Sequence, residues 1–508
     1  MIPLLIAHFI INESWEAVDD VRGFKKSCLT YMKKNIFEAV LIGLMVIIIL
    51  MLIFGGIAGM NLFKAKKYAS IISIKTVNFT DIIHQTDTIS DIALMDTETA
   101  KMFGERTLGE LEDLVSAYDV ADQYTTINLN GKPMKISPLE YDSFFKYKEH
   151  QDSGIPGYVL VDPVNNVARY VKSQKSINYS PSAYYGKYLK RKLWSYNPTA
   201  IYGDSFFELD ENDGMYWITP ILKASIGLFN GKIVKSVVIT DATTGECKTY
   251  ELSEIPSWVD IVIDGDTIRK YYNWYGKLRN GFWNSIFAQN GCFVTTDDYG
   301  YKTINDDVYI YTGVTSCNNS KSVTGFVLAN SRTGEILFMP VTGAEEHSAM
   351  STAEGEVADY GWKASFPSII NINGEPAYLM VLKDSNNIVK RYAIVNISNY
   401  SIVAIDTTQK KVLQRYNALL MGENDFSGNN DSSHNSQEVI EIPENAITKT
   451  ITIKEIQYIV NGTNTIVYVK DTEGKVYKSA FDETWILKSI GDQASITFVE
   501  ASPISRIK

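Results

Sequence analysis

A single uncharged stretch near the start of the chain limits its topology more than any other feature. Residues 39–63 are 25 consecutive positions without a charged side chain. At about 1.5 Å per residue, a helix of this length reaches roughly 37 Å, which exceeds a hydrocarbon layer of about 30 Å. It is also longer than the apolar part of a signal peptide, about 7–15 residues. The sequence therefore predicts one transmembrane helix, assigned to residues 36–63, with membrane lipid as its partner.

Positive charges flank this segment unequally. Five basic side chains precede it and three follow it: Arg22, Lys25, Lys26, Lys33 and Lys34, then Lys64, Lys66 and Lys67. Because the more basic flank usually stays in the cytoplasm, we expect a single-pass protein of the cytoplasmic membrane with its N-terminus inside. Residues 1–35 then form a cytoplasmic and juxtamembrane segment, in which residues 1–12 receive no role.

Two glycines four residues apart, Gly55 and Gly59, lie in the same segment. This GxxxG spacing lets two membrane helices approach closely and can support a homo-oligomer. Glycine is also common in membrane helices without any such role. The second explanation is preferred, and a homo-oligomer through the helix is the alternative.

Composition restricts the rest of the chain. The 508 residues exceed one ordinary hydrophobic core, and 45% apolar residues exclude a disordered chain. The formal net charge of −11 argues against nucleic acid as a partner, because nucleic-acid binding needs a basic face. The content of 31 Tyr and 33 Gly favours strands joined by many turns.

Two kinds of hairpin recur beyond the apolar segment. The first joins two strands by a turn rich in Asp, Asn, Thr and Gly, where Gly245, Gly334, Gly474, Asn166 and Asn387 can adopt positive φ. Its copies lie at 158–171, 237–252, 326–341, 378–395 and 466–481. The second is built around Asn-Gly-x-Pro at 126–137 and 372–382, with a variant at 207–220. The irregular spacing of these hairpins excludes a regular solenoid. Hairpins interspersed with helices predict an α+β, β-rich extracytoplasmic region over 64–421.

Helices are expected to be fewer. Asp96–Leu111 has the spacing of a helix capped by Asp96, and further helices are expected at 343–360, 255–260 and 401–420. Residues 422–437 contain one large apolar side chain and form a predicted flexible linker. Residues 438–508 read as a separate small β domain, in which Gly491–Asp492 forms the turn before the last long strand.

Long phrases of the chain carry a resemblance to a known family. GIPGYVLVDPVNNVARYV at 154–171, YYNWYGKLRNGFWNSIF at 271–287 and GAEEHSAMSTAEGEV at 343–357 are examples. In these phrases the region from about Val77 to Leu420 resembles an uncharacterised family of membrane-anchored, β-rich extracytoplasmic proteins of low-GC Gram-positive anaerobes. The resemblance implies a place in the bacterial cell envelope, but it implies no activity and no site residues.

Two narrower resemblances concern individual modules. Hairpin phrases such as VVITDATTGECKTYEL at 237–252 look like those of PepSY-type domains, which implies tandem hairpin and helix modules associated with protease regulation. The C-terminal region, ending in LKSIGDQASITFVEASPISRIK, looks like a small OB-type β-barrel. It lacks the basic and aromatic strip of nucleic-acid-binding OB folds, which implies a module that faces protein or glycan.

One candidate for chemistry is the phrase around His347. Glu345, Glu346, His347 and Ser348 are a candidate hydrolase or metal cluster. The alternative is the first turn of a helix, where acidic side chains are favoured by the helix dipole. Adjacent helical residues point in different directions, so the second interpretation is preferred. The other histidines are His8, His84, His150 and His434, and none pairs at metal spacing.

Acidic side chains gather at two turns. The first turn contains Glu208, Asp210, Glu211 and Asp213, but the spacing of a calcium loop is not met. The second region contains Asp297, Asp298, Asp306 and Asp307. Two of these acids can be read as a glycosidase pair, and the simpler interpretation for both groups is solvated acids at strand ends.

An aromatic run is the remaining candidate site. Its members are Tyr271, Tyr272, Trp274, Tyr275, Phe282, Trp283 and Phe287. One interpretation is a platform for sugar rings or a partner. The other is a helix that packs its aromatic side chains into the core, and it is preferred because Trp274, Leu278, Phe282 and Ser285 follow helical spacing.

No catalytic, cofactor-binding or metal-ligating residue is assigned from these patterns. The preferred function is a non-enzymatic binding, sensing or scaffolding protein of the cell envelope, with another envelope protein or cell-wall glycan as partner. The alternative is a regulator of an envelope protease or a cell-envelope hydrolase, which a deep cleft with several acids would favour. Cys247, Cys292 and Cys317 lie in the extracytoplasmic region and allow at most one internal disulfide, whose pairing stays open.

Overall fold

The computed structural model describes residues 36–318, 321–421, 446–461, 464–480, 488, 490–499 and 504–507. The chain divides into two units, one up to Asn417 and one from Ala418 onwards. The predicted cytoplasmic segment 1–35 and the predicted linker 422–437 lie outside the described residues, and so do Cys28, His8 and His434.

Four antiparallel sheets in the first unit repeat one strand order, and we call them blades 1 to 4. In each blade, four strands pair one after another along the chain, and a short strand pairs with the second of them. Blade 1 comprises β2 (Tyr118–Val120), β3 (Thr125–Leu129), β4 (Lys132–Tyr141), β5 (Ile155–Asp162) and β6 (Val167–Ile177). Blade 2 comprises β7 (Ile201–Tyr202), β8 (Phe206–Leu209), β9 (Met215–Ile226), β10 (Asn230–Asp241) and β11 (Cys247–Glu251).

The other two blades follow the same pattern. Blade 3 comprises β12 (Phe293–Thr295), β13 (Gly300–Ile304), β14 (Asp307–Ser316), β16 (Gly325–Asn330) and β17 (Ile336–Met339). Blade 4 comprises β19 (Lys363–Ala364), β20 (Ser368–Ile372), β21 (Glu375–Lys383), β22 (Val389–Asn396) and β23 (Val403–Asp406). The early strand β1 (Ile74–Thr76) adds in parallel to the outer strand β17, and β15 (Ser322–Val323) pairs with β18 (Gly343–Ala344).

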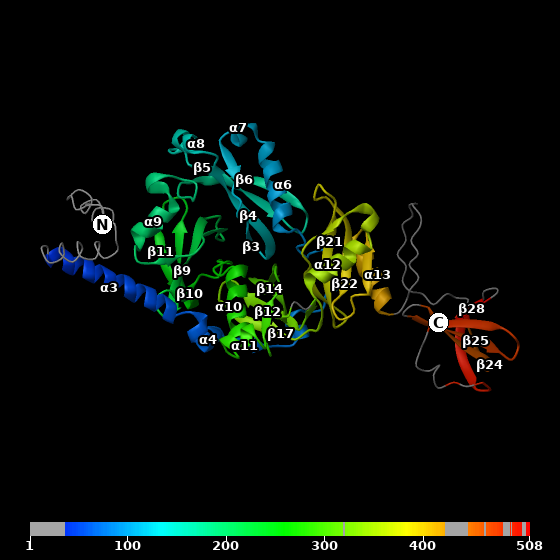
Figure 1. Ribbon diagram of the computed structural model, residues 1–508. Coiled ribbons are helices and arrows are strands. Elements are labelled where there is room, and N and C mark those ends of the chain that lie inside the picture. The colour runs from blue at the N-terminus through cyan, green and yellow to red at the C-terminus, as the bar shows by residue number, and fades with distance from the viewer. Residues whose placement is uncertain are drawn as a thin grey trace, which may run out of the picture. The chain divides into compact units, whose positions relative to one another are not determined.

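The four blades surround a common centre (Figure 1). The short strands that pair with the second strand of each blade lie innermost, since β3 contacts β8 and β14, and β13 contacts β20. Four-stranded sheets arranged around a central channel are the architecture of a β-propeller. The β-rich α+β class predicted from the sequence is confirmed, and the closed ring of blades is a feature that the sequence did not predict.

Both predicted hairpin types occur within the blades. The Asn-Gly hairpins join the short inner strand to the second strand in blades 1 and 4. The other type joins the third and fourth strands of blades 1, 2 and 3, and the second and third strands of blade 4. The hairpins are therefore strands of shared sheets rather than separate tandem modules. The turn residues Asn166, Gly245, Gly334, Asn387 and Gly474 all have positive φ, as predicted.

Hydrophobic cores fill the spaces between successive blades. Trp217 of β9 packs towards blade 1, whereas its neighbour Ile218 packs towards blade 3. In the same way, Val327 of β16 faces blade 2 and Phe326 faces blade 4. Because both faces of blades 2 and 3 are buried, their central strands are continuous apolar runs rather than alternating ones.

A polar contact links the last blade to the first. Lys383 of β21 is buried and contacts the Asp96 carboxylate, and its Nζ donates to Thr99 Oγ1 at 2.9 Å. Asp96 caps α6 (Thr97–Gly109) by accepting from the Thr99 amide at 2.8 Å, so the predicted Asp96 cap is confirmed. Burial raises the pKa of Asp96, but hydrogen bonds from Lys383 and Thr99 outweigh it and lower the pKa below its ordinary value.

The other helices meet the predictions unevenly. The helix expected at 343–360 appears as α12 (Glu346–Gly355) and a 3-10 turn (Ala358–Tyr360), since Gly343 and Ala344 pair in β18. The region 401–420 contains β23 followed by α13 (Gln409–Leu420). The helix expected at 255–260 is wrong, because these residues form an irregular segment whose Val259 is fully buried and whose Asp260 and Ile261 amides bond Glu208.

Short helices complete the first unit. They are α5 (Phe79–Ile82), α7 (Glu112–Val115), α8 (Phe144–His150), α9 (Leu189–Tyr196), α10 (Gly265–Leu278) and α11 (Phe282–Ile286), with 3-10 turns at Tyr185–Lys187 and Leu252–Glu254. The helix α10 packs on blade 3 and also contacts α11 and α4 (Asn61–Ala69).

The apolar segment forms α3 (Ile36–Ala58), and α4 (Asn61–Ala69) follows it. Within the described part of the chain, no helix taken alone has the length and apolar composition needed to cross a membrane, whereas Gly43–Ala58 and Asn61–Ala69 have both when taken together, with a 54° bend between them. Most of the large apolar side chains of α3 are exposed, with Phe54 at 68%.

The glycine pair of α3 lies against blade 2. The β9–β10 turn places Leu228 beside Gly55 so closely that a methyl group on Gly55 would meet it at 2.3 Å. Asn230, the first residue of β10, lies beside Gly59 and its side-chain amide donates to the Gly56 carbonyl oxygen at 2.8 Å. This side of the helix is therefore in contact with blade 2.

The second unit contains a closed five-stranded barrel with the order β24-β25-β26-β28-β27. Its strands are β24 (Ala446–Asn461), β25 (Asn464–Asp471), β26 (Val476–Ala480), β27 (Gln493–Val499) and β28 (Ile504–Ile507). The predicted β domain and the turn at Gly491, which has a φ of 97°, are both found.

Candidate functional site

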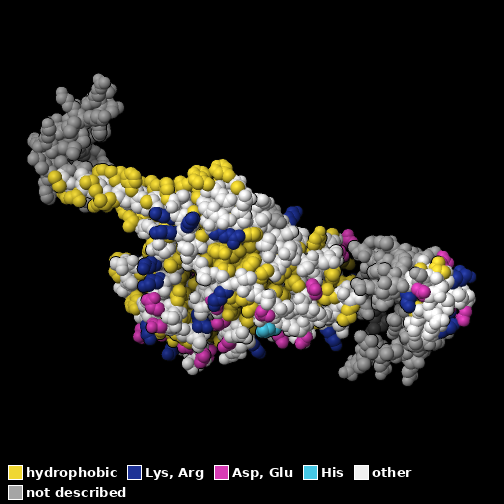
Figure 2. Space-filling view, turned by 90° about the horizontal axis from the view of Figure 1, so that it is seen from below, with side chains coloured by type: hydrophobic (Ala, Val, Ile, Leu, Met, Phe, Trp, Pro, Cys, Tyr) yellow, Lys and Arg dark blue, Asp and Glu magenta, His cyan; other side chains and the backbone are white. Residues whose placement is uncertain are grey.

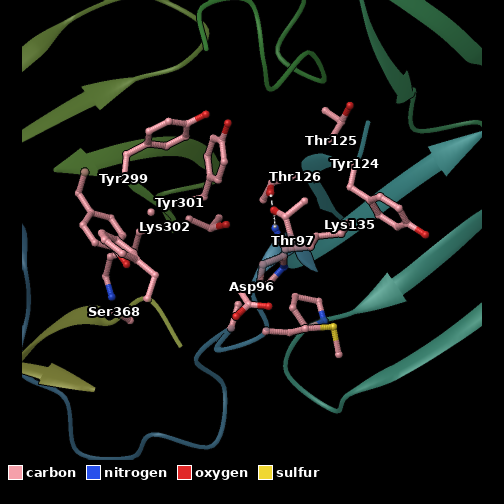
Figure 3. A pocket seen from close by; sticks show the side chains of 18 of the residues that line it. Asp96, Thr97, Tyr124, Thr125, Thr126, Lys135, Tyr299, Tyr301, Lys302 and Ser368 are labelled. Atoms are coloured by element: carbon pink, nitrogen blue, oxygen red, sulfur yellow. Dashed lines mark hydrogen bonds between the residues drawn. The ribbon is translucent and has the colours of Figure 1, made fainter. Parts of the chain in front are cut away.

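A cavity of about 1140 Å³ lies at the centre of the ring of blades. Thr125, Thr126 and Lys135 come from blade 1, Phe206 from blade 2, residues 300–303 from blade 3 and Ser368 from blade 4. The inner strands β3 and β13 supply much of its wall (Figure 3). We call it the axial cavity, and it is the candidate functional site.

Two lysines line the axial cavity: Lys135, which is buried, and Lys302, which is half-buried. Lys135 Nζ donates to Thr97 Oγ1 at 3.2 Å and to Thr126 Oγ1 at 3.3 Å, and it lies 5.8 Å from the centre of the Tyr301 ring. Lys302 Nζ donates to the carbonyl oxygen of Ile369 at 3.1 Å. Burial lowers the pKa of each amine to about 8, and the charge of Asp96 partly counteracts this at Lys135. These amines can donate hydrogen bonds to a ligand at neutral pH.

Several polar atoms in the wall have no partner within the protein. The hydroxyl groups of Tyr124, Thr125 and Thr303 and the amide oxygen of Asn128 are buried without a hydrogen bond. Buried polar groups are nearly always satisfied, and a missing partner is commonly water or a ligand. The cavity wall therefore offers both donors and acceptors to a polar molecule.

Carboxylates also line the cavity. Asp264 caps α10 through the Thr267 amide at 2.7 Å, and Asp266 pairs with Arg269 at 3.2 Å. Asp297, Asp298 and Asp306 line the cavity too, so three of the four acids predicted as a second group meet at this site. The fourth, Asp307, instead pairs with Arg332 and accepts from Asn330 Nδ2 at 2.8 Å.

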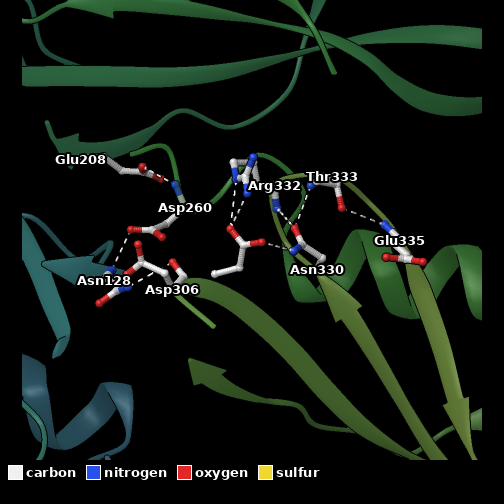
Figure 4. A network of polar contacts seen from close by, with 9 residues as sticks. Asn128, Glu208, Asp260, Asp306, Asn330, Arg332, Thr333 and Glu335 are labelled. Atoms are coloured by element: carbon white, nitrogen blue, oxygen red, sulfur yellow. Dashed lines mark hydrogen bonds and ion pairs between the residues drawn. The ribbon is translucent and has the colours of Figure 1, made fainter. Parts of the chain in front are cut away.

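A carboxyl pair lies beside the cavity between blades 1, 2 and 3 (Figure 4). Glu208 is fully buried and accepts from the Asp260 and Ile261 amides at 2.8 Å each, while Asp260 accepts from the Asn128 amide at 2.7 Å. Burial raises the pKa of Asp260 to about 7, and burial together with the Asp260 charge raises the pKa of Glu208 well above its ordinary value. Asp260 therefore holds a proton at mildly acidic pH.

The remaining acids of the first predicted group behave as the simpler interpretation expects. Asp210 closes its own turn by accepting from the Asn212 and Gly214 amides at 2.9 and 2.7 Å. Glu211 and Asp213 are exposed. Only Glu208 departs from the expectation of a solvated acid, because it supports the irregular segment that replaces the predicted 255–260 helix.

The four residues around His347 do not form a cluster. Glu345 is the N-cap residue of α12 and its carboxylate accepts from Ser348 Oγ at 3.1 Å, whereas His347 is exposed. Glu346 is fully buried, accepts from the Gly313 amide at 2.6 Å and has a pKa raised by burial to about 7. The helix-terminus interpretation is confirmed, since the side chains point in different directions.

The aromatic run divides into a buried half and an exposed half. Tyr271 and Tyr272 on α10 are buried, as the core interpretation predicted. Gly281 ends this helix region with a φ of 95°, and α11 then carries Trp283, which is 62% exposed, towards Phe287, which is 76% exposed. The core interpretation is therefore wrong for Trp283 and Phe287.

Metal and redox features are few in the described ranges. There, no group of three or more His, Cys, Asp or Glu side chains is placed to hold a metal ion. Cys247, Cys292 and Cys317 are free thiols. The Cys317 amide donates to the Cys292 carbonyl oxygen at 3.2 Å, so these two cysteines lie opposite each other just beyond the pairing of β12 with β14.

Sequence reasoning did not identify Lys135, Lys302, Tyr124, Tyr299 or Tyr301 as site residues. A signal existed, since Lys135 and Lys302 each lie on a strand of an inner hairpin, β3–β4 and β13–β14. Recognising it requires knowing that these hairpins face one axis.

Comparisons with known proteins give little further guidance. No protein-family model and no curated protein matches the chain. A mutant of Bacillus megaterium levansucrase is 9% identical, with a TM-score of 0.17, and the match covers 86% of this chain and 95% of that one. A Cellvibrio cellulosa alpha-L-arabinanase mutant is 8% identical, with a TM-score of 0.16, over 64% of this chain and 85% of that one. Similarities this weak carry no argument about the fold or the function.

Proposed function

We propose that the protein is a membrane-anchored, extracytoplasmic binding or sensing protein of the cell envelope, and that the axial cavity binds its ligand. The observation that carries this proposal is a large cavity lined from all four blades, in which blades 1 and 3 supply lysine donors and polar atoms without a partner. A pocket with a few convergent polar groups in an apolar frame is the usual form of a small-ligand site.

The wall chemistry favours cell-wall glycan fragments as the ligand class. Tyr299, Tyr301 and Phe366 supply ring faces, while Lys302 and Asp298 supply a donor and an acceptor. Sugar rings present apolar faces for aromatic packing and hydroxyl groups for hydrogen bonding, and aromatic side chains with a polar atom suit both.

Binding of glycan fragments provides the first test. We expect soluble peptidoglycan fragments to bind the full chain in detergent, and Tyr301→Ala or Lys302→Met to weaken binding at least tenfold, about 1.4 kcal/mol. Isothermal titration calorimetry measures the affinity. Lys390→Met is the matched control, because Lys390 pairs with Asp384 outside the cavity. Equal affinity in all variants would reject the axial cavity as the binding site.

A cell-envelope hydrolase is the second candidate, and one observation favours it. Asp264, Asp266, Asp297 and Asp298 line the same cavity, which meets the condition of a deep cleft with several acids. Two carboxyl groups that flank a glycosidic bond can act as acid and as base or nucleophile. In this case Asp297→Asn abolishes the release of reducing ends from peptidoglycan but preserves binding. Protease regulation, which the PepSY-type resemblance implies, remains a further alternative.

The exposed apolar side chains of α3 support the membrane location. The free cysteines offer a separate test of the side on which the blades lie. If the blades face an oxidising compartment outside the membrane, we expect Cys292 and Cys317 to form a disulfide and Cys247 to stay free. Mass spectrometry of peptides from unreduced protein, alkylated in intact cells, detects this bond. Three alkylated thiols in protein from an oxidising host envelope would contradict the location.

The barrel of the second unit supports a finer assignment. We propose an OB-type module, because its order β24-β25-β26-β28-β27 is a closed five-stranded barrel in which β26 and β28 run parallel. Such a module would contribute a protein- or glycan-facing surface.

A further inference from the structure

One surface of the first unit combines exposed apolar side chains with lysines. It is formed by α4, the exposed side of α10, α11 with Phe287, and the β9–β10 turn, and we call it the basal face. Its exposed apolar members are Met60, Phe63, Leu228, Phe229, Trp283, Ile286 and Phe287. Figure 2 shows that hydrophobic side chains continue from α3 onto the adjoining surface. An exposed apolar patch of this kind marks an interaction site.

The elements of the basal face are held together by packing. Tyr68 and Ala65 of α4 are buried against Ile226 at the end of β9 and Leu278 of α10. Tyr68 lies with its ring 5.0 Å from that of Trp274, and its hydroxyl donates to the Gly59 carbonyl oxygen at 3.0 Å. The exposed side chains are therefore presented by a packed surface.

Lysines surround these apolar side chains. Lys66 and Lys67 on α4, Lys232 beside the β9–β10 turn, and Lys270 and Lys277 on α10 are all exposed. Among the acids nearby, Asp266 is paired with Arg269. The whole chain carries a net charge of −11, so a local excess of lysines indicates a partner with negative charge.

A groove connects the two kinds of side chain. It has a volume of about 600 Å³ and lies between α4, α10 and α11. Trp274, Phe282 and Ile286 supply apolar walls, while Lys270 and Lys277 supply ammonium groups. The apolar walls fit an acyl chain or a glycerol backbone, and the ammonium groups fit a phosphate.

From these observations we propose that the basal face docks on the surface of a bilayer that contains anionic phospholipids. This inference rests on the proposed membrane location of α3. The β9–β10 turn contacts Gly55, Gly56 and Gly59 near the C-terminal end of α3, which places Leu228 and Phe229 where that helix leaves the hydrocarbon layer. Aromatic side chains accumulate at this depth, and lysines beside it are attracted to anionic lipid.

The charge pattern distinguishes a lipid surface from a second copy of the chain. Two copies joined through their basal faces would bring two sets of five lysines together, and like charges across an interface oppose association. Anionic headgroups instead neutralise the same lysines. The proposal therefore commits to lipid, and self-association is an outcome that its test can detect.

The test uses the full chain reconstituted in vesicles of phosphatidylcholine alone or with 30% phosphatidylglycerol, composed of ordinary or brominated acyl chains. Bromine quenches tryptophan only near the acyl chains. The quenching that differs between the natural protein and Trp283→Phe reports the depth of Trp283. We expect this component to be at least twofold larger in the phosphatidylglycerol vesicles, and to fall by half or more in the double variant Lys270→Glu, Lys277→Glu.

The matched control is the double variant Lys172→Glu, Lys175→Glu. It makes the same charge change on exposed residues of β6 in blade 1, which lies away from α4 and α11 (Figure 1). We expect its Trp283 quenching to equal that of the natural protein. Flotation of each sample on a density gradient measures anchoring independently.

The outcomes separate the docking from the anchor. Protein that floats in both vesicle types but shows no Trp283 quenching overturns the docking and leaves the anchor intact. Quenching that is insensitive to both phosphatidylglycerol and charge reversal also overturns it. Cross-linked dimers that shield Trp283 from brominated lipid would assign the basal face to self-association. Protein that fails to float overturns the membrane location itself.

Discussion

Replacing Lys383 with Met is expected to destabilise the first unit by about 2–4 kcal/mol. Lys383 joins blade 4 to the N-terminus of α6 through Asp96, and its ammonium group is buried. Removing one partner of a buried ion pair leaves the other charge uncompensated, which typically costs about 3–5 kcal/mol. The Asp96 side chain is 26% exposed and keeps its hydrogen bond from the Thr99 amide, so the expected loss is about 1 kcal/mol smaller than that range. Urea unfolding in detergent, followed by tryptophan fluorescence, measures the change.

The neighbouring pair Lys390–Asp384 supplies the control for this prediction. It lies in the same blade, at a distance of 3.0 Å, but its lysine side chain is 36% exposed. Exposed pairs contribute about 0–1 kcal/mol, so Lys390→Met should shift the unfolding midpoint little. Equal losses in the two variants would show that the contact between the last and first blades has no special role in stability.

The second large effect concerns pH and the buried carboxyl pair beside the axial cavity. Asp260→Asn should gain stability relative to the natural protein by on the order of 3–4 kcal/mol when the pH rises from 4 to 8. The reason is the difference between the folded pKa of about 7 and the ordinary value of 3.8. This contribution is fully present below pH 4, where both states are protonated, and is lost as the pH rises through 7.

Urea unfolding at several pH values tests this sign. Asp384→Asn is a suitable comparison, because hydrogen bonds from the Ile388 and Asn386 amides and Lys390 lower the pKa of Asp384. Its stability contribution changes only at acidic pH, so its difference from the natural protein should be constant between pH 5 and pH 8. A constant difference for Asp260→Asn over the same interval would mean that the pair ionises normally in the folded protein.

The sequence predicted local structure better than assembly. Asn166 and Gly245 adopt the positive φ that their turns require, and Asp96 caps its helix, because such features depend on a few adjacent residues. The ring of blades depends on which face of each hairpin meets the next one. Strands such as β16 are apolar on both faces, and such strands give no information about their neighbours.

For the candidate site, too, residues that cluster along the chain were predicted, and residues brought together only by the fold were not. Asp297, Asp298 and Asp306 were candidates from their clustering along the chain, and they do line the axial cavity. Lys135 lies about 160 residues away in the sequence and meets them only because blades 1 and 3 face one axis. The 255–260 segment was misread because its backbone is satisfied by the distant side chain of Glu208.

The contact between α3 and the β9–β10 turn has a mechanical consequence. Leu228 and Asn230 contact Gly55, Gly56 and Gly59, so the helix packs directly on blade 2. A tilt, rotation or axial shift of α3 would therefore move the β9–β10 turn of blade 2 with it. Conversely, a ligand in the axial cavity that draws the blades together would shift α3 through the same contact.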